Sequence, residues 1–107
     1  MRFLIGLLLL AGSTCWSRAD ELTPLAKRGE ALAKKMCADC HAVGRTDLSP
    51  HVGAPPFRAL DRRLDIDSFM QRLRGGLTSG HSDMLTFRFT PQDARAFIAY
   101  LRSVQGP

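Results

Sequence analysis

The sequence predicts an all-α domain of three to four helices. Apolar residues recur at helical spacing in three stretches, residues 25–37, 66–73 and 94–101. Two of these stretches follow a threonine–proline pair and the third follows an aspartate, which are residues typical of helix starts. Between the stretches, glycine and proline interrupt regular structure. At 107 residues the chain has room for one domain.

The first 19 residues have the features of a secretory signal peptide. A positive start and an apolar run over residues 3–11 precede the small-x-small cleavage pattern Ser17-Arg18-Ala19. The apolar run is too short to cross a membrane as a helix, so we expect cleavage after residue 19 and no stable membrane insertion afterwards. The alternatives are an uncleaved anchor and a lipid anchor at Cys15.

The mature domain, residues 20–107, keeps two of the three cysteines and a formal charge of +3 instead of +5, because Arg2 and Arg18 are lost. This cysteine usage fits export to the bacterial periplasm, which is oxidising. The mild positive charge suits redox partners with acidic docking patches and does not indicate nucleic-acid binding. We expect a monomer.

The first helix is predicted over Leu25–Cys37, with Thr23 as its cap and Pro24 at its first position. Gly29 lies in the helix interior, where glycine costs about 1 kcal/mol relative to alanine. Gly29 either permits a close contact with another helix or is a tolerated glycine.

Residues 37–41 read Cys-Ala-Asp-Cys-His, which is the spacing of covalent haem attachment. If these residues form one helical turn, Cys37 and Cys40 lie on one side and His41 is four residues from Cys37. Both thiols can then reach the two vinyl groups of one porphyrin, with the imidazole of His41 facing the iron. The motif therefore predicts one covalent haem c.

Two other sites use a Cys-x-x-Cys pair. A zinc site needs four ligands, which His51 and His81 would have to complete. A dithiol redox site would follow a buried strand of a βαβ unit, and no stretch of the sequence has the pattern of such a unit.

Residues 43–56 are predicted to form a loop, because two glycines and three prolines interrupt them. A backbone carbonyl from this loop is expected to accept the second ring proton of His41 and so fix its tautomer. His51, in the same loop, is interpreted as an exposed residue without a ligand role.

A short helix is expected over Phe57–Leu64, with Phe57 and Leu60 facing inward. Asp65 or Asp67 then caps a helix that ends at Gly75-Gly76. Met70 lies on the apolar stripe of this helix and is interpreted as core packing instead of a sulfur ligand.

Residues 77–89 lack a clear period and are expected to form a loop over the second face of the haem. Thr90-Pro91 then begins the last helix, whose buried stripe is Ala94, Phe97, Ile98 and Leu101, with Tyr100 beside it.

Taken together, the chain resembles the small class I c-type cytochromes of bacteria over its whole mature length. The resemblance is most specific at residues 37–41, 53–57, 80–84 and 97–101. It implies the monohaem cytochrome c fold, with helices around one covalently attached haem, and a crossing of the first and last helices at Gly29 and either Phe97 or Tyr100.

The resemblance also implies roles for individual residues. Cys37 and Cys40 match the thioether anchors, and His41 and Met84 match the two axial ligands of the iron. The remaining matches concern the haem surroundings: Pro55 accepts a hydrogen bond from the proximal histidine, Phe57 packs on the haem, and Arg63 meets a propionate.

One departure from the family lies next to the distal ligand. Relatives commonly follow this methionine with proline, and here Leu85 takes that place. The iron–sulfur bond of Met84 would then be easier to displace. His81, three residues earlier, is the alternative ligand on the same face.

The predicted function is electron transfer by a periplasmic haem protein that cycles between ferric and ferrous states, without enzymatic activity. His/Met ligation raises the reduction potential and leaves no open position on the iron. The alternative is a haem protein whose distal ligand is displaced, acting as a small-ligand binder, a sensor or a weak peroxidase. A third reading is an electron-transfer subunit of a larger complex.

Overall fold

A computed structural model describes residues 12–13, 21–76, 84 and 86–106. Within these residues the chain forms helices α1 (Pro24–Met36), α2 (Ile66–Gly75) and α3 (Pro91–Val104), and one 3-10 helix, η1 (Phe57–Arg62). None of the described residues belongs to a β-strand. The all-α prediction is confirmed.

The α-helices begin where the sequence predicts. The side chains of Thr23, Asp65 and Thr90 accept hydrogen bonds from the backbone N–H groups three residues further on, at 3.2, 2.8 and 3.1 Å. Asp65 is therefore the cap of α2, while Asp67 lies in the first turn and forms an ion pair with Arg102 of α3.

The predicted helix ends are slightly too long. α1 ends at Met36 with Cys37 as its C-cap, and η1 ends at Arg62 instead of Leu64. Differences of one or two residues are normal where terminal turns tighten. Residues 43–56 form turns and bends, as predicted.

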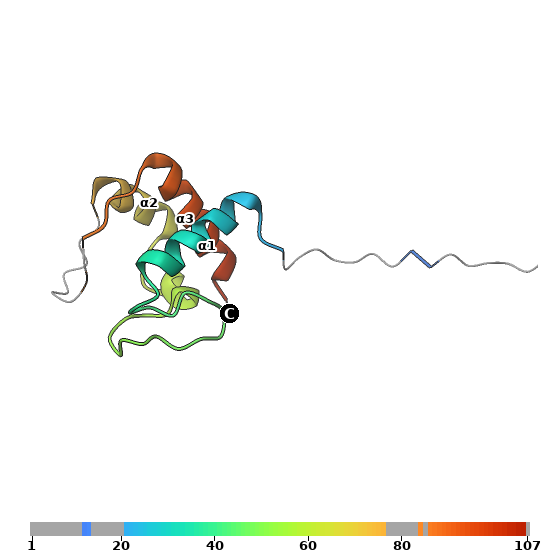
Figure 1. Ribbon diagram of the computed structural model, residues 1–107, viewed down its shortest axis with the longest axis horizontal. Coiled ribbons are helices and arrows are strands. Elements are labelled where there is room, and N and C mark those ends of the chain that lie inside the picture. Colours follow the sequence, from blue (N-terminus) through green and yellow to red (C-terminus); the bar gives the residue numbers. More distant parts are fainter. Residues whose placement is uncertain (1–11, 14–20, 77–83, 85, 107) are drawn as a thin grey trace, which may run out of the picture.

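Helix α3 is the central element, because α1, α2 and η1 each pack against it (Figure 1). Its buried residues include the whole predicted stripe and Tyr100, together with Ala96 and Val104. α1 crosses α3 at Gly29. A Cβ atom added to Gly29 would overlap the carbonyl oxygen of Ala96 and lie 2.8 Å from the Cβ of Tyr100.

The crossing settles two open points. Gly29 permits a close helix contact, and the interpretation as a merely tolerated glycine is wrong. Of the two partners expected from the resemblance, Tyr100 is the one at the crossing. Phe97 instead lies among aromatic rings, with centroid distances of 5.6 Å to Phe57 and 5.5 Å to Phe89.

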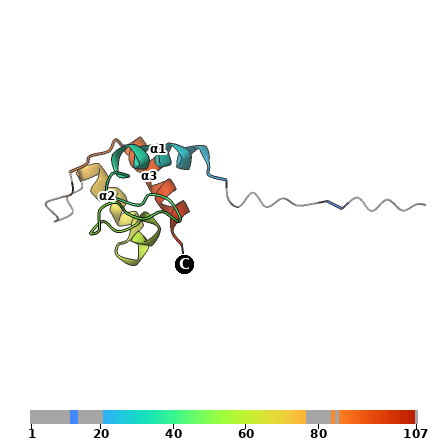
Figure 2. The same ribbon diagram turned by 60° about the horizontal axis from the view of Figure 1, so that its bottom comes forward.

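The long loop between α1 and η1, green in Figures 1 and 2, runs below the helices in Figure 1, on the same side as η1, and comes to the front in Figure 2. Phe57 at the start of η1 donates its N–H to the carbonyl of Ala42, at 2.8 Å, so the loop returns to its own beginning. Residues 42 and 57 therefore hold the base of the loop together.

Several predictions fall outside the described residues. These are the signal peptide with its cleavage site and Cys15, and His81 and Leu85 in the segment before α3. In the part of the chain that the structure describes, no helix has both the length and the apolar character needed to span a membrane.

Candidate functional site

The turn that carries the cysteines closes as the motif requires. The N–H groups of Cys40 and His41 both donate to the carbonyl of Cys37, at 3.2 and 2.9 Å, and Cys37 itself donates to Ala33 in α1 at 2.9 Å. Residues 37–41 thus form one turn continuous with the end of α1. The single turn expected for the motif is present.

This turn forms one wall of a cavity of about 580 Å³, which lies in the range typical of small-molecule and cofactor sites. Every site residue predicted from the sequence contributes to its lining: Cys37, Cys40, His41, Pro55, Phe57, Arg63 and Met84. Most of the remaining lining comes from apolar side chains of the core, among them Leu60, Phe69, Leu73, Phe89 and Phe97.

His41 is oriented by the loop that follows it. Its Nδ1 lies 2.8 Å from the carbonyl oxygen of Pro55, which can only accept, so Nδ1 carries the proton. The ring of Phe57 packs beside the imidazole, with the centroids 5.3 Å apart and the planes tilted by 46°. Nε2 is therefore left with the lone pair that a metal requires.

The two cysteines have different surroundings. Cys37 is half-buried and Cys40 is exposed, and both are free. Burial, with a smaller contribution from Cys40, raises the pKa of the Cys37 thiol to about 11. Cys37 is therefore a neutral thiol at neutral pH. In the described ranges, no three His, Cys, Asp or Glu side chains converge on a possible metal position. His81, which the zinc alternative also needs, lies outside those ranges.

Three methionines lie near the cavity. Met84 is half-buried and lines it, as does Met36 at the end of α1. Met70 packs against the core cluster and does not contribute to the lining, which fits its interpretation as a packing residue.

Three polar residues of the lining were not among the predicted site residues: Asp39 within the motif, His51 and Arg72. His51 is exposed, as predicted, yet it borders the cavity: its N–H donates to the carbonyl of Cys40 and its Nδ1 accepts from the N–H of Gly53, both at 3.1 Å. Arg72 of α2 also lines the cavity. The spacing of Arg72 from Phe69 and Leu73 on one helix face was the available signal.

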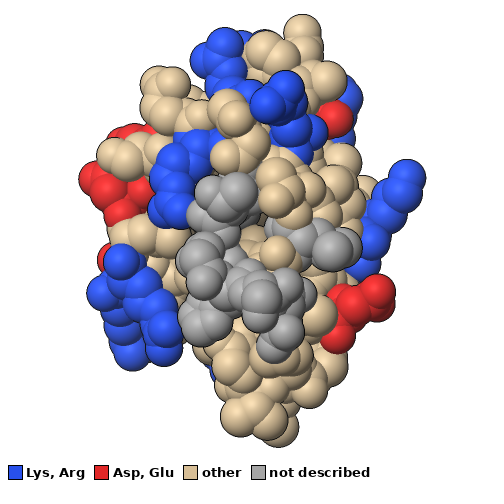
Figure 3. Space-filling view, turned by 90° about the vertical axis from the view of Figure 1, so that its left-hand side faces the viewer, with Lys and Arg blue, Asp and Glu red and all other residues tan. Residues whose placement is uncertain are grey.

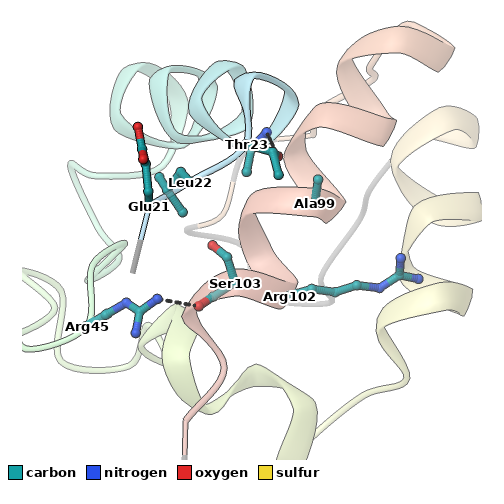
Figure 4. A pocket seen from close by; sticks show the side chains of 8 residues that line it. Glu21, Leu22, Thr23, Arg45, Ala99, Arg102 and Ser103 are labelled. Carbon is teal, nitrogen blue, oxygen red and sulfur yellow. Dashed lines mark hydrogen bonds between the residues drawn. The ribbon is translucent and has the colours of Figure 1, made fainter. Parts of the chain in front are cut away.

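A second, smaller pocket of about 330 Å³ lies between the start of α1 and the end of α3 (Figure 4). Arg45 reaches it and donates from Nη2 to the carbonyl of Ser103, at 2.9 Å. Among the residues that the structure describes, no cysteine, histidine or methionine lines this pocket. The chemistry-bearing residues of the motif all belong to the larger cavity.

The residues of the larger cavity fit a covalently attached haem. Two thiols and an imidazole with a free Nε2 come from one turn, the remaining lining is mainly apolar, and two arginines stand on the walls. Such a donor set suits a flat apolar ring that carries two carboxylates and an iron.

Comparisons with known proteins agree with this fit. The family model of "Cytochrome C oxidase, cbb3-type, subunit III" matches residues 24–101. Cytochrome c-552 of Bradyrhizobium diazoefficiens is 30% identical over 89 residues, which cover 83% of this chain and 84% of the relative. No solved structure matches the chain. The chain therefore belongs to the small monohaem c-type cytochromes, a family of electron-transfer proteins that carry covalently bound haem c.

Proposed function

We propose that the protein is a periplasmic electron carrier in which His41 and Met84 are the axial ligands of the haem iron. The main support for this proposal is that His41 and Met84 line the same cavity as Cys37 and Cys40. When bound, the haem supplies a one-electron couple between ferric and ferrous iron. The chain supplies the anchors, the ligands and a surrounding of low polarity.

His41 is prepared for this role by its hydrogen bond to Pro55. A histidine that donates its second ring proton to a carbonyl is a more basic and better oriented ligand. The thioether of Met84 is a weaker donor than a second imidazole and favours the ferrous state, so the pair gives a raised potential. With both axial positions taken by side chains, we expect no enzymatic activity.

The polar residues of the lining have a complementary task. Arg63 and Arg72 stand on the cavity walls and suit the two propionate groups, because a guanidinium binds a carboxylate through two parallel hydrogen bonds. Their positive charges also disfavour the extra charge of ferric iron, which adds to the effect of the thioether.

We further propose that the partners are redox proteins with acidic docking patches. Basic side chains gather in several groups on the face seen in Figure 3, and the acidic groups in that view lie nearer its edges. The last turns of α1 and α2 run toward this side in Figure 1 and carry Lys34, Lys35, Arg72 and Arg74. Charge complementarity of this kind speeds the encounter of redox partners and weakens with salt.

Export rests on the signal peptide proposed for residues 1–19. Cell fractionation and the mass of the mature protein test it: the expected species begins at residue 20 and is found in the periplasm. A mature chain that retains residue 1, or a cytoplasmic location, would contradict the proposal.

The experiment for the ligands is a spectroscopic redox titration of the holoprotein with two methionine variants. Met84→Ala is expected to lose the iron–sulfur charge-transfer band of the ferric form and to have a lower potential. Met70→Ala removes a methionine that packs on the core outside the cavity, and it should keep the band. An unchanged spectrum in Met84→Ala would rule out Met84 as a ligand.

The same titration separates the carrier from a ligand-binding haem protein. That second function rests on Leu85, which follows Met84 in place of the usual proline. If the wild type lacks the charge-transfer band and its ferrous form readily binds carbon monoxide, the carrier proposal fails and the ligand-binding function replaces it.

A further inference from the structure

Helix α3 holds the loop that follows His41 at both of its ends. We call residues 42–56 the proximal loop. Near its start, the buried hydroxyl of Tyr100 donates to the carbonyl of Val43 at 2.5 Å. Just beyond its end, the side chain of Gln105 donates to the carbonyl of Phe57 at 2.7 Å. The carbonyl that accepts from His41 belongs to Pro55, between these two attachments.

The amide of Gln105 is fully engaged. Its Nε2 donates to the carbonyls of Phe57 and Leu101, at 2.7 and 2.8 Å, and its Oε1 accepts from the N–H of Asp61 at 3.0 Å. Two acceptors on one side and one donor on the other fix the orientation of the amide. Gln105 thereby joins the end of α3 to both the first and the fifth residue of η1.

Gln105 thus holds the carbonyl of the same residue, Phe57, whose ring touches the imidazole of His41. Phe57 packs its ring on His41 at a centroid distance of 5.3 Å, and its N–H is held by Ala42, next to His41. Pro55, two residues earlier, accepts the Nδ1 proton at 2.8 Å. With the carbonyl of Phe57 held by Gln105, residues 55–57 have little freedom to move relative to His41.

We propose that Gln105 is a positioning residue for His41: it keeps the Pro55 carbonyl and the Phe57 ring against the imidazole and so sets its basicity and orientation. The inference rests on the proposed role of His41 as the proximal ligand. A carbonyl held close to Nδ1–H makes the imidazole a stronger donor, which favours the ferric state. Loosening this contact is expected to shift the equilibrium toward the ferrous state.

The test compares three variants of the holoprotein. Gln105→Met keeps the length of the side chain and removes all three hydrogen bonds without adding charge. Gln105→Asn keeps the amide but shortens its reach by one methylene, and serves if the first variant does not take up haem. Gln92→Met makes the same change on an exposed glutamine at the opposite end of α3 and is the control.

Two readouts report on His41 itself. The ferric-to-ferrous equilibrium of Gln105→Met should shift toward ferrous by about threefold, which is about 28 mV at 59 mV per tenfold change. Exchange of the His41 Nδ1 proton, followed by NMR in the ferrous form, should accelerate by about fivefold or more, the effect of losing one net hydrogen bond from a local opening. Gln92→Met should match the wild type in both.

A purely structural role gives a different result. If Gln105→Met unfolds at a lower temperature but keeps the wild-type potential and proton exchange, Gln105 only anchors the end of α3 and the inference is wrong. Failure of the proposed function is recognised separately, since the wild type itself would then lack the iron–sulfur charge-transfer band.

Discussion

Replacing Gly29 or Gly75 by alanine is expected to change the stability of the protein in opposite directions, because only Gly29 lies in the crossing of α1 and α3. A methyl group on Gly29 would overlap the carbonyl oxygen of Ala96, with the carbonyl carbon at 2.6 Å and the Cβ of Tyr100 at 2.8 Å. These are backbone atoms and the root of a side chain, so only a separation of the helices relieves the clash. Overpacking of this kind costs about 1–3 kcal/mol, and the gain from replacing a helical glycine offsets at most about 1 kcal/mol of it.

Gly29→Ala is therefore expected to lower the free energy of unfolding of the holoprotein by up to about 2 kcal/mol, or the midpoint of thermal unfolding by several degrees. Gly75→Ala is the matched control, because a Cβ there meets nothing within 4 Å. It should stabilise the protein by about 0.4–1 kcal/mol through the unfolded chain. Denaturant titrations of both variants measure the difference. A Gly29→Ala variant that gains stability as Gly75→Ala does would refute the close crossing.

Two further predictions concern the hydrogen bond of Tyr100 and the charge of Arg63. Tyr100→Phe leaves the buried Val43 carbonyl without that donor and should cost about 1–3 kcal/mol. Burial raises the pKa of Tyr100 above its usual 10.0. The stability that the neutral hydroxyl contributes is therefore complete below pH 10 and is lost as the pH rises through the higher pKa of the folded state. In Tyr100→Phe, the free energy of unfolding should lack this loss above pH 10. Arg63→Gln removes a positive charge from the cavity wall and should shift the redox equilibrium toward the ferric state on the order of threefold. Arg62→Gln is the control, because Arg62 is exposed and lies outside the lining, and it should leave the equilibrium unchanged.

The features that could be predicted from the sequence are local ones. Thr23 and Thr90 cap their helices through atoms only three residues away, so the pattern of residue types suffices. The turn at residues 37–41 is likewise closed by bonds within five residues. The hydrogen bond between His41 and Pro55 spans 14 residues. A carbonyl acceptor from the loop after the motif could be expected from the sequence, and the resemblance to the family implied that it belongs to Pro55.

Other features depend on how distant segments meet, and residue patterns do not contain that information. Gly29 could be expected at a crossing, but whether its partner was Phe97 or Tyr100 depends on the rotation of α3 about its axis. The position of Arg72 on the cavity wall depends on how α2 packs on α3. Gln105 is a polar residue after the end of a helix, which usually faces solvent, and only the placement of η1 beside it shows its three partners.

The aromatic residues tie the fold and the site together. Phe57, Phe89 and Phe97 are buried, and the rings of Phe57 and Phe89 both pack on that of Phe97. The same three side chains line the cavity. A change in any of them therefore alters the packing of α3 and the surroundings of the iron at once, and stability and potential move together. Gln105 contacts backbone groups and lies outside the cavity lining. Its substitution therefore changes none of the aromatic side chains around the iron. A shift of potential in that variant, at a temperature where the protein is fully folded, separates the orientation of His41 from the polarity of its surroundings.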